Sequence, residues 1–262
     1  MVRYIYLWFN FFSNTLTRDM EFKTNFIGNL IVDSVYYGAH YFFFSIIFSY
    51  VDALGQFTSE DVKLFLIITF LSDTIYMMIF SGNLFNLNKL IVSGDLDFAL
   101  LKPASSQFIV SFRYVKSYAI VSIIILSSLL FNLIILNENE ITLFNFILFL
   151  FSFINGQAIW YSLDFMIGCA AFWFKNFTVG GWLSHEFLKF AERPDSIYTG
   201  MLRRTMFSVL PMALLSSIPA RILIYGPGWD YLTWQFIIVI FFLLLARFIW
   251  KTGVQKYESA SS

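Results

Sequence analysis

The chain has 262 residues, of which 58% are hydrophobic and only 13% are charged, whereas an ordinary soluble domain carries roughly 25% charged residues. Its 17 basic and 17 acidic side chains cancel and no long basic run occurs, so the electrostatic signature of a nucleic-acid-binding protein is missing. Nearly continuous apolar runs exclude a membrane β-barrel, whose strands alternate apolar and polar residues. The composition therefore predicts an all-α integral membrane protein.

The first expected element is an amphipathic helix over residues 1–22. Apolar side chains recur there at helical spacing, and polar residues occupy the other face: Arg3, Asn10, Ser13, Asn14, Thr17 and Arg18. This pattern is typical of a helix that lies in the membrane interface. The alternative is that these residues begin the first span, which the charged residues at 18–23 disfavour. Cleavage as a signal peptide is not expected, because polar residues interrupt the apolar run.

Apolar stretches long enough to cross a bilayer recur along the chain. A helix of about 20 residues spans the hydrocarbon core, and five stretches reach that length: residues 24–50, 64–85, 108–136, 143–174 and 233–250. A further span is expected within residues 177–225. The sequence therefore predicts six transmembrane helices.

Charges in the connecting segments set the expected orientation. Basic residues gather before the first span, around the loop 84–105 and after the last span. The loops 51–61 and 137–141 carry acidic residues without Lys or Arg. Because basic loops stay in the cytoplasm, both termini are expected there, which requires an even number of crossings.

The inward loop 84–105 mixes apolar and charged residues, which predicts a short amphipathic helix beneath the membrane. Gly94 permits a sharp chain reversal, and Pro103 should end any helix before the next span. The alternative is a solvated connector, but a connector has no need of so many apolar side chains in water.

Asp33, Asp73 and Asp164 lie within apolar stretches. A carboxylate costs about 2.5 to 3.5 kcal/mol at the centre of a membrane helix on insertion scales. These residues are therefore expected to face a partner helix or a wet cavity, as candidates for a translocation pathway or an interface. The alternative is a structural hydrogen bond between helices.

Four segments follow one another in a characteristic order: SGDLDFALLKP at 93–103, AFWF at 171–174, ERPDSIY at 192–198 and VLPMALLSSIPARIL at 209–223. With the amphipathic start and the basic C-terminal end closing on KYESASS, they resemble the ABC type-2 family of exporter permeases. More narrowly, they resemble a bacterial branch of about this length that carries a G-D-L-D-F-x-L-L-x-P signature. The resemblance covers essentially the whole chain and implies a single permease domain over residues 1–262.

The resemblance also implies roles for individual segments. Residues 1–22 would be the elbow helix, and the loop 84–105 between spans two and three would carry a coupling helix that docks on a separate ATPase subunit. The coupling residues would be Leu90, Gly94, Asp95, Leu96, Asp97, Phe98, Leu100 and Lys102. Two permease chains, identical or sister chains, would pair with two ATPase subunits in the bacterial cytoplasmic membrane. They would enclose a path for an amphiphilic cargo among the membrane lipids.

Two models remain for residues 175–225. Hydropathy favours residues 206–225 as the fifth span, with residues 175–204 in the cytoplasm. The resemblance implies a short fifth span at 177–191 and an external re-entrant hairpin at 193–228 before span six. Pro211 and Pro219 suit such a broken element, and we expect the hairpin. Arg221 would then be available to anionic headgroups or cargo.

No G-x-x-x-x-G-K-[ST] motif occurs, so this chain lacks a cradle for the phosphates of ATP. ATP and Mg²⁺ are therefore expected on the partner, with no cofactor, metal site or catalytic residue in this chain. The sequence thus predicts the permease subunit of an ATP-driven exporter. The alternative is an ion-coupled secondary transporter or a channel, with a membrane enzyme third.

Overall fold

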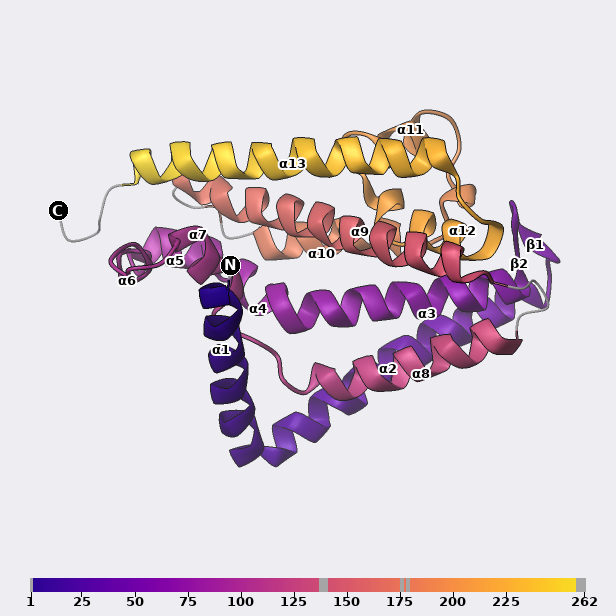
Figure 1. The fold of residues 1–262 in the computed structure, drawn as a ribbon, viewed down its shortest axis with the longest axis horizontal. Helices are drawn as coiled ribbons and strands as arrows, with labels where there is room; N and C mark the ends of the chain where they lie inside the picture. The colour runs from indigo at the N-terminus through magenta and orange to yellow at the C-terminus, as the bar shows by residue number, and fades with distance from the viewer. Residues whose placement is uncertain (1, 137–140, 175–176, 178–179, 258–262) are drawn as a thin grey trace.

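The computed structural model describes residues 2–136, 141–174, 177 and 180–257, and these are almost entirely helical (Figure 1). Within these residues, five helices are long and apolar enough to cross a membrane: Lys23–Phe48, Ser59–Ser93, Ala119–Leu136, Leu143–Phe172 and Trp229–Lys256. The predicted all-α membrane architecture is confirmed. The sixth span stays a prediction. Glu138 and Glu140 lie outside the described residues, and so does the KYESASS end after Tyr257.

The N-terminal helix α1 (Val2–Glu21) lies across the direction of the long helices, and α2 (Lys23–Phe48) leaves its far end obliquely (Figure 1). Its two ends are tied to other parts of the chain. The Arg3 guanidinium donates to the Pro103 carbonyl at 2.7 Å, and the Ser105 N–H donates to the Tyr4 hydroxyl at 3.2 Å. The Ser117 hydroxyl donates to the Asp19 carboxylate at 2.6 Å. An amphipathic α1 is therefore present, and its interfacial location stays a prediction.

A two-stranded hairpin, β1 (Ala53–Leu54) and β2 (Phe57–Thr58), precedes α3 (Ser59–Tyr76). Gly55 takes a φ of 67° at the turn, which glycine adopts without the steric cost of a Cβ. The Thr58 hydroxyl accepts from the Asp61 N–H, and the Asp61 carboxylate accepts from the Thr58 N–H at 2.9 Å. This capping box fixes where the helix begins.

The helix does not stop at Tyr76 but loosens into a wider π turn, η1 (Met77–Ser81), followed by α4 (Gly82–Leu84). At the same level α7 (Ser106–Phe112) ends and α8 (Ala119–Leu136) has not yet begun. The Asn83 side chain bonds both the N–H and the carbonyl of Tyr114 at 2.7 Å, and the Lys116 N–H donates to the Met78 carbonyl. These contacts satisfy the unpaired backbone there. The prediction of one continuous span over residues 108–136 is therefore wrong at residues 113–118.

The core is organised around α9 (Leu143–Cys169), which continues as η2 (Ala170–Phe172) and packs against α12 (Ser217–Tyr225) and α13 (Trp229–Lys256). At Gly156 an added Cβ would lie 2.7 Å from the Leu215 carbonyl oxygen, so glycine allows the two backbones to meet. The Gln235 amide donates to the carbonyls of Ser152 and Leu214 at 3.0 and 2.8 Å. Packing and buried polar contacts thus fasten α13 to this centre.

The stretch after α9 is broken into short pieces: α10 (Gly180–Ala191), η3 (Asp195–Ile197), α11 (Gly200–Phe207), η4 (Met212–Leu214) and α12. The continuous helix over residues 206–225 that hydropathy alone favours is not formed. Pro211 has no N–H to donate, and the backbone at Ser208 and Ser216 leaves helical geometry. Both α11 and α12 lie at the β1–β2 end of the molecule, opposite the two chain termini (Figure 1).

Candidate functional site

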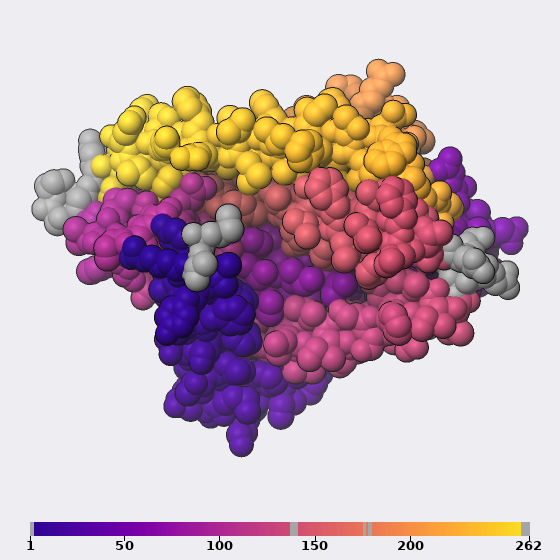
Figure 2. Space-filling view, in the orientation of Figure 1, coloured from indigo at the N-terminus to yellow at the C-terminus, as the bar shows by residue number. Residues whose placement is uncertain are grey.

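Residues 84–105, which we call the coupling segment, form two short helices, α5 (Leu87–Ser93) and α6 (Asp97–Leu100). The segment lies on the surface beside α1 and the C-terminal end of α13 (Figure 2). Gly94 ends α5 with a φ of 85°, a left-handed conformation that favours glycine. The Leu96 N–H then donates back to the Leu90 carbonyl at 3.1 Å. The predicted chain reversal at Gly94 is therefore present.

The predicted coupling residues divide into inward and outward groups. Leu96 is fully buried, whereas Phe98 is 66% exposed. Asp95 and Lys102 are exposed, and Leu90, Gly94, Asp97 and Leu100 are half-buried. Leu101, which the sequence analysis did not select, is 81% exposed. The burial of Leu96 anchors the segment. Its exposed large apolar side chains are Phe85, Val92, Phe98 and Leu101, of which Phe98 and Leu101 are the most exposed.

The C-terminal end of α13 braces the coupling segment from behind. The Tyr257 hydroxyl donates to the Gly94 carbonyl at 2.9 Å, and its ring packs against Phe172. Burial, and then the neighbouring Asp97 carboxylate, raises the pKa of the Tyr257 phenol. Tyr257 therefore keeps the proton that it donates. This contact joins positions 163 residues apart, and no pattern in the sequence indicates it.

The three carboxylates that stand out in the apolar stretches meet at one cavity. It has a volume of about 490 Å³ and is lined by α2, α3, α9 and α10. Asp33, Asp73 and Asp164 line it together with Glu192, which follows α10. The structure thus brings the three predicted residues together, and it adds Glu192, which sequence reasoning missed because it lies in a polar segment.

Hydroxyl groups hold three of these carboxylates. Tyr37 donates to Asp73 at 2.8 Å and Tyr36 donates to Glu192 at 2.6 Å. Both Tyr76 and Ser184 donate to Asp164. His40 Nε2 lies 3.2 Å from Glu192. The bonds to Asp73 and Asp164 join different helices. The alternative interpretation of these two residues, that they form structural hydrogen bonds between helices, is therefore also supported.

One lysine lies among the carboxylates. Lys116 lines the cavity just before α8, and it attracts the charges of Asp73 and Asp33. Burial lowers the pKa of the Lys116 ammonium group, and the two carboxylates act in the opposite direction. No ion pair within 4.0 Å joins Lys116 to another described side chain.

Aromatic side chains form much of the remaining wall. Tyr76 stacks on Trp160 with ring centroids 3.8 Å apart and planes 2° from parallel. Tyr37 stacks on Phe70, and Phe85, at the start of the coupling segment, also lines the cavity. The cavity therefore combines acidic groups with flat aromatic faces.

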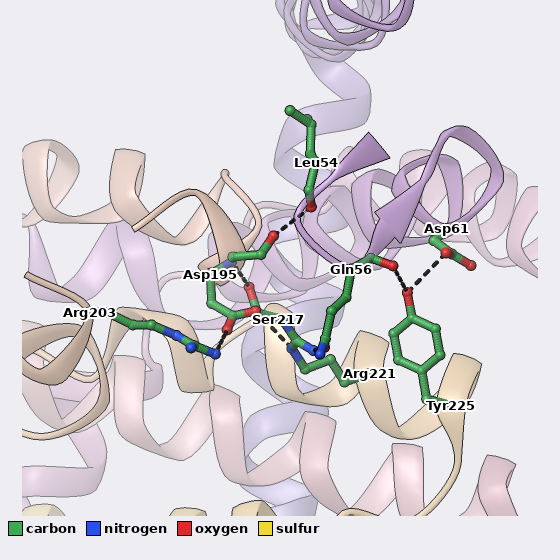
Figure 3. A network of polar contacts seen from close by, with 9 residues as sticks. Leu54, Gln56, Asp61, Asp195, Arg203, Ser217, Arg221 and Tyr225 are labelled. Atoms are coloured by element: carbon green, nitrogen blue, oxygen red, sulfur yellow. Dashed lines mark hydrogen bonds and ion pairs between the residues drawn. The ribbon is translucent and has the colours of Figure 1, made fainter. Parts of the chain in front are cut away.

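Arg221, the fourth predicted pathway residue, lies outside this cavity in a separate polar network (Figure 3). Its guanidinium donates to Asp195 at 2.8 Å and to the Gln56 side chain at 2.6 Å, and it stacks over the Phe57 ring. Arg203 pairs with the other oxygen of Asp195 at 2.9 Å. Arg221 is buried and engaged in this network, and it also lines a second pocket with Gln56 and Tyr225. Its availability to headgroups or cargo stays a prediction.

The same network joins residues 193–228 to the β1–β2 hairpin. The Tyr225 hydroxyl lies within 2.9 Å of the Gln56 carbonyl and of the Asp61 carboxylate, and the Ser196 hydroxyl donates to the Leu54 carbonyl at 2.7 Å (Figure 3). The Asp195 N–H donates to the Ser217 hydroxyl. The broken helices are therefore fastened as one unit at the end opposite the coupling segment.

In the part of the chain that the structure describes, no group of three or more His, Cys, Asp or Glu side chains is placed to hold a metal ion. A family model described as ABC-2 family transporter protein matches residues 34–261. Neither a curated protein nor a solved structure matches the chain.

Proposed function

The chain belongs to the ABC-2 family of transporter proteins, and on that premise we propose that it is the permease subunit of an ATP-driven exporter. As a multi-pass membrane protein it forms the translocation pathway together with a second permease chain, identical or a sister chain. Two separate ATPase subunits bind ATP and Mg²⁺ and hydrolyse the nucleotide, and this chain takes no part in the chemistry.

The exposed apolar surface of the coupling segment is the observation that carries this proposal. Phe98 and Leu101 present their side chains to solvent beside the charged Lys102. Each apolar side chain gains roughly 1.5 to 3 kcal/mol when it is buried against a partner. The segment is held on one side by α1 and on the other by Tyr257, so a force applied to it reaches the long helices. An exposed apolar surface on a segment that is held at both sides suits docking into a groove of an ATPase.

The features at the two ends of the molecule support assigning one end to each side of the membrane. Both termini and the coupling segment gather at one end, which we assign to the cytoplasm because basic residues flank it. Residues 193–228 lie at the other end, which we assign to the outside, where they act as a re-entrant lid. In this arrangement α1 is the elbow helix on the inner leaflet, and α10 supplies the short fifth crossing.

An ion-coupled secondary transporter is the second candidate, because Asp33, Asp73 and Asp164 line a cavity within the membrane-spanning region. Such carboxylates relay protons in pumps and transporters. A secondary transporter, however, has no need of an exposed docking segment. Export that continues without ATP, driven by an ion gradient, would favour this candidate.

Affinity purification of the chain tests the proposal. The unaltered chain should retain an ATPase subunit that carries a G-x-x-x-x-G-K-[ST] motif. Combining Phe98→Ser with Leu101→Ser should weaken that association at least about 100-fold, since two apolar side chains lose their burial. Val209→Ser is the matched control, because Val209 is 70% exposed and follows α11, which lies at the opposite end (Figure 1). No ATPase with the unaltered chain, or equal retention by all three chains, would overturn the proposal.

A further inference from the structure

The cavity between α2, α3, α9 and α10 carries an excess of acidic groups. Asp33, Asp73, Asp164 and Glu192 line it, whereas Lys116 is the one lysine or arginine among its described lining residues. His185 also lines the cavity. Carboxylates in a membrane-spanning region are costly unless a charge or a hydrogen bond compensates them. The excess of acids therefore favours a positively charged occupant.

The carboxylates are not compensated equally. Asp164 and Glu192 have a partner on each oxygen. Asp73 accepts from Tyr37 on Oδ2 only, and no hydrogen bond or ion pair joins Asp33 to another described side chain. Asp33 and the second oxygen of Asp73 thus remain free to meet a cation, with Lys116 as the competing charge.

The aromatic rings of the cavity indicate which kind of cation it suits. Tyr36, Tyr37, Tyr76, Trp160 and Phe85 line the same space. The negative face of an aromatic ring attracts a cation within about 6 Å of its centre, most strongly where water is excluded. Because the acids come from four elements around an aromatic wall rather than converging on one point, they suit a delocalised organic charge better than a small metal ion.

Size gives the last constraint. A volume of about 490 Å³ falls within the roughly 300 to 1,000 Å³ of pockets that enclose small organic molecules. The lining also includes Val32, Met77 and Leu188, which offer apolar contact. We propose that this cavity binds an amphiphilic organic cation. The proposal rests on the exporter function and makes such a cation the cargo class, with Asp33 and Asp73 as the residues that select its charge.

Binding of tetraphenylphosphonium to the full chain in lipid nanodiscs tests this inference. Beyond its partition into empty nanodiscs, the cation should bind the chain, and tetraphenylborate, an anion of nearly the same shape, should show no such additional binding and should not compete. Asp33→Asn should weaken tetraphenylphosphonium binding about tenfold by removing a negative charge from the cavity wall, and Asp33→Glu should restore it. Asp230→Asn, which removes an exposed acid at the start of α13, should leave the affinity unchanged.

Lys116→Gln should change the affinity for the cation in the opposite direction. Removing the competing positive charge should tighten binding of the same cation severalfold, a gain that loss of folding cannot produce. Equal affinities for all variants, or equal binding of the borate and the phosphonium, would overturn the inference. These results are separable from the exporter proposal: an ATPase that co-purifies with a chain indifferent to tetraphenylphosphonium would refute only the cargo class. Selective binding without an ATPase would refute only the exporter.

Discussion

Asp195 is fully buried, and each of its carboxylate oxygens is paired with an arginine. Arg221 is itself buried and reaches on to Gln56 of the β1–β2 hairpin, so the pair joins segments 165 residues apart. A buried ion pair adds little net stability, but breaking it by removing one partner leaves an uncompensated charge. Here the ion pair determines where α12 lies, because it fixes α12 against the β1–β2 hairpin.

Arg221→Met should therefore destabilise the chain by about 3 kcal/mol, since Asp195 would keep only the partly exposed Arg203. Chemical unfolding in detergent measures this change. Arg204→Met is the control: Arg204 is exposed, has no ion pair among the described residues, and its replacement should cost less than about 0.5 kcal/mol. Equal losses for the two variants would contradict a structural role for the pair.

Individual residues show how much of the cavity could be predicted from the sequence. Asp33, Asp73 and Asp164 stand out because a charge in an apolar stretch needs a reason, and all three line one cavity. Glu192 also lines that cavity but lies in a polar segment, where charges are ordinary, and Lys116 lies where the predicted span 108–136 is interrupted. Only the packing of α10 and of the α7–α8 connection against the long helices brings them there. Leu96 and Phe98 differ in burial although they are two residues apart, which pattern alone does not resolve.

At the scale of elements, hydropathy locates long helices well and interruptions poorly. The helices α2, α9 and α13 fall where apolar length predicts them. The break between α7 and α8 depends on Asn83, whose side chain satisfies the backbone of Tyr114 from another helix. The breaks in residues 193–228 depend on Pro211 and on the network around Asp195. Such tertiary contacts have no periodic signal in the sequence.

The proposed external location of residues 193–228 gives a prediction about this element. Thr199 is exposed, whereas Ser196 is bonded to the hairpin, so Thr199→Cys should react with a membrane-impermeant thiol reagent added outside intact cells. Lys102→Cys, in the coupling segment, should react only after the membrane is opened. The native Cys169 is buried and should stay silent in both. Reaction of position 199 only in opened membranes would place this element in the cytoplasm and remove the lid.

At the scale of the whole molecule, three features lie in sequence along the long axis. The coupling segment stands at one end, the acidic and aromatic cavity is enclosed by α2, α3, α9 and α10, and the fastened broken helices stand at the other end (Figure 1). Helix α3 and its extension through η1 and α4 run from the hairpin to the coupling segment and contribute Asp73, Tyr76 and Met77 to the cavity wall. If the coupling segment docks on an ATPase as proposed, this continuous stretch of chain connects it to the cavity. The π turn at Met77–Ser81 is the place where that stretch is least regular.

If the coupling segment touches an ATPase as proposed, a cross-link formed at Leu101 should capture that contact. A photo-reactive amino acid in place of Leu101 should, on illumination of membranes from the native host, join this chain to a subunit with a G-x-x-x-x-G-K-[ST] motif, identified by mass spectrometry. The same amino acid in place of Val209, which follows α11 and is also exposed, should give no such product. An ATPase product from position 209, or none from position 101 in membranes where the chain is inserted, would contradict the account.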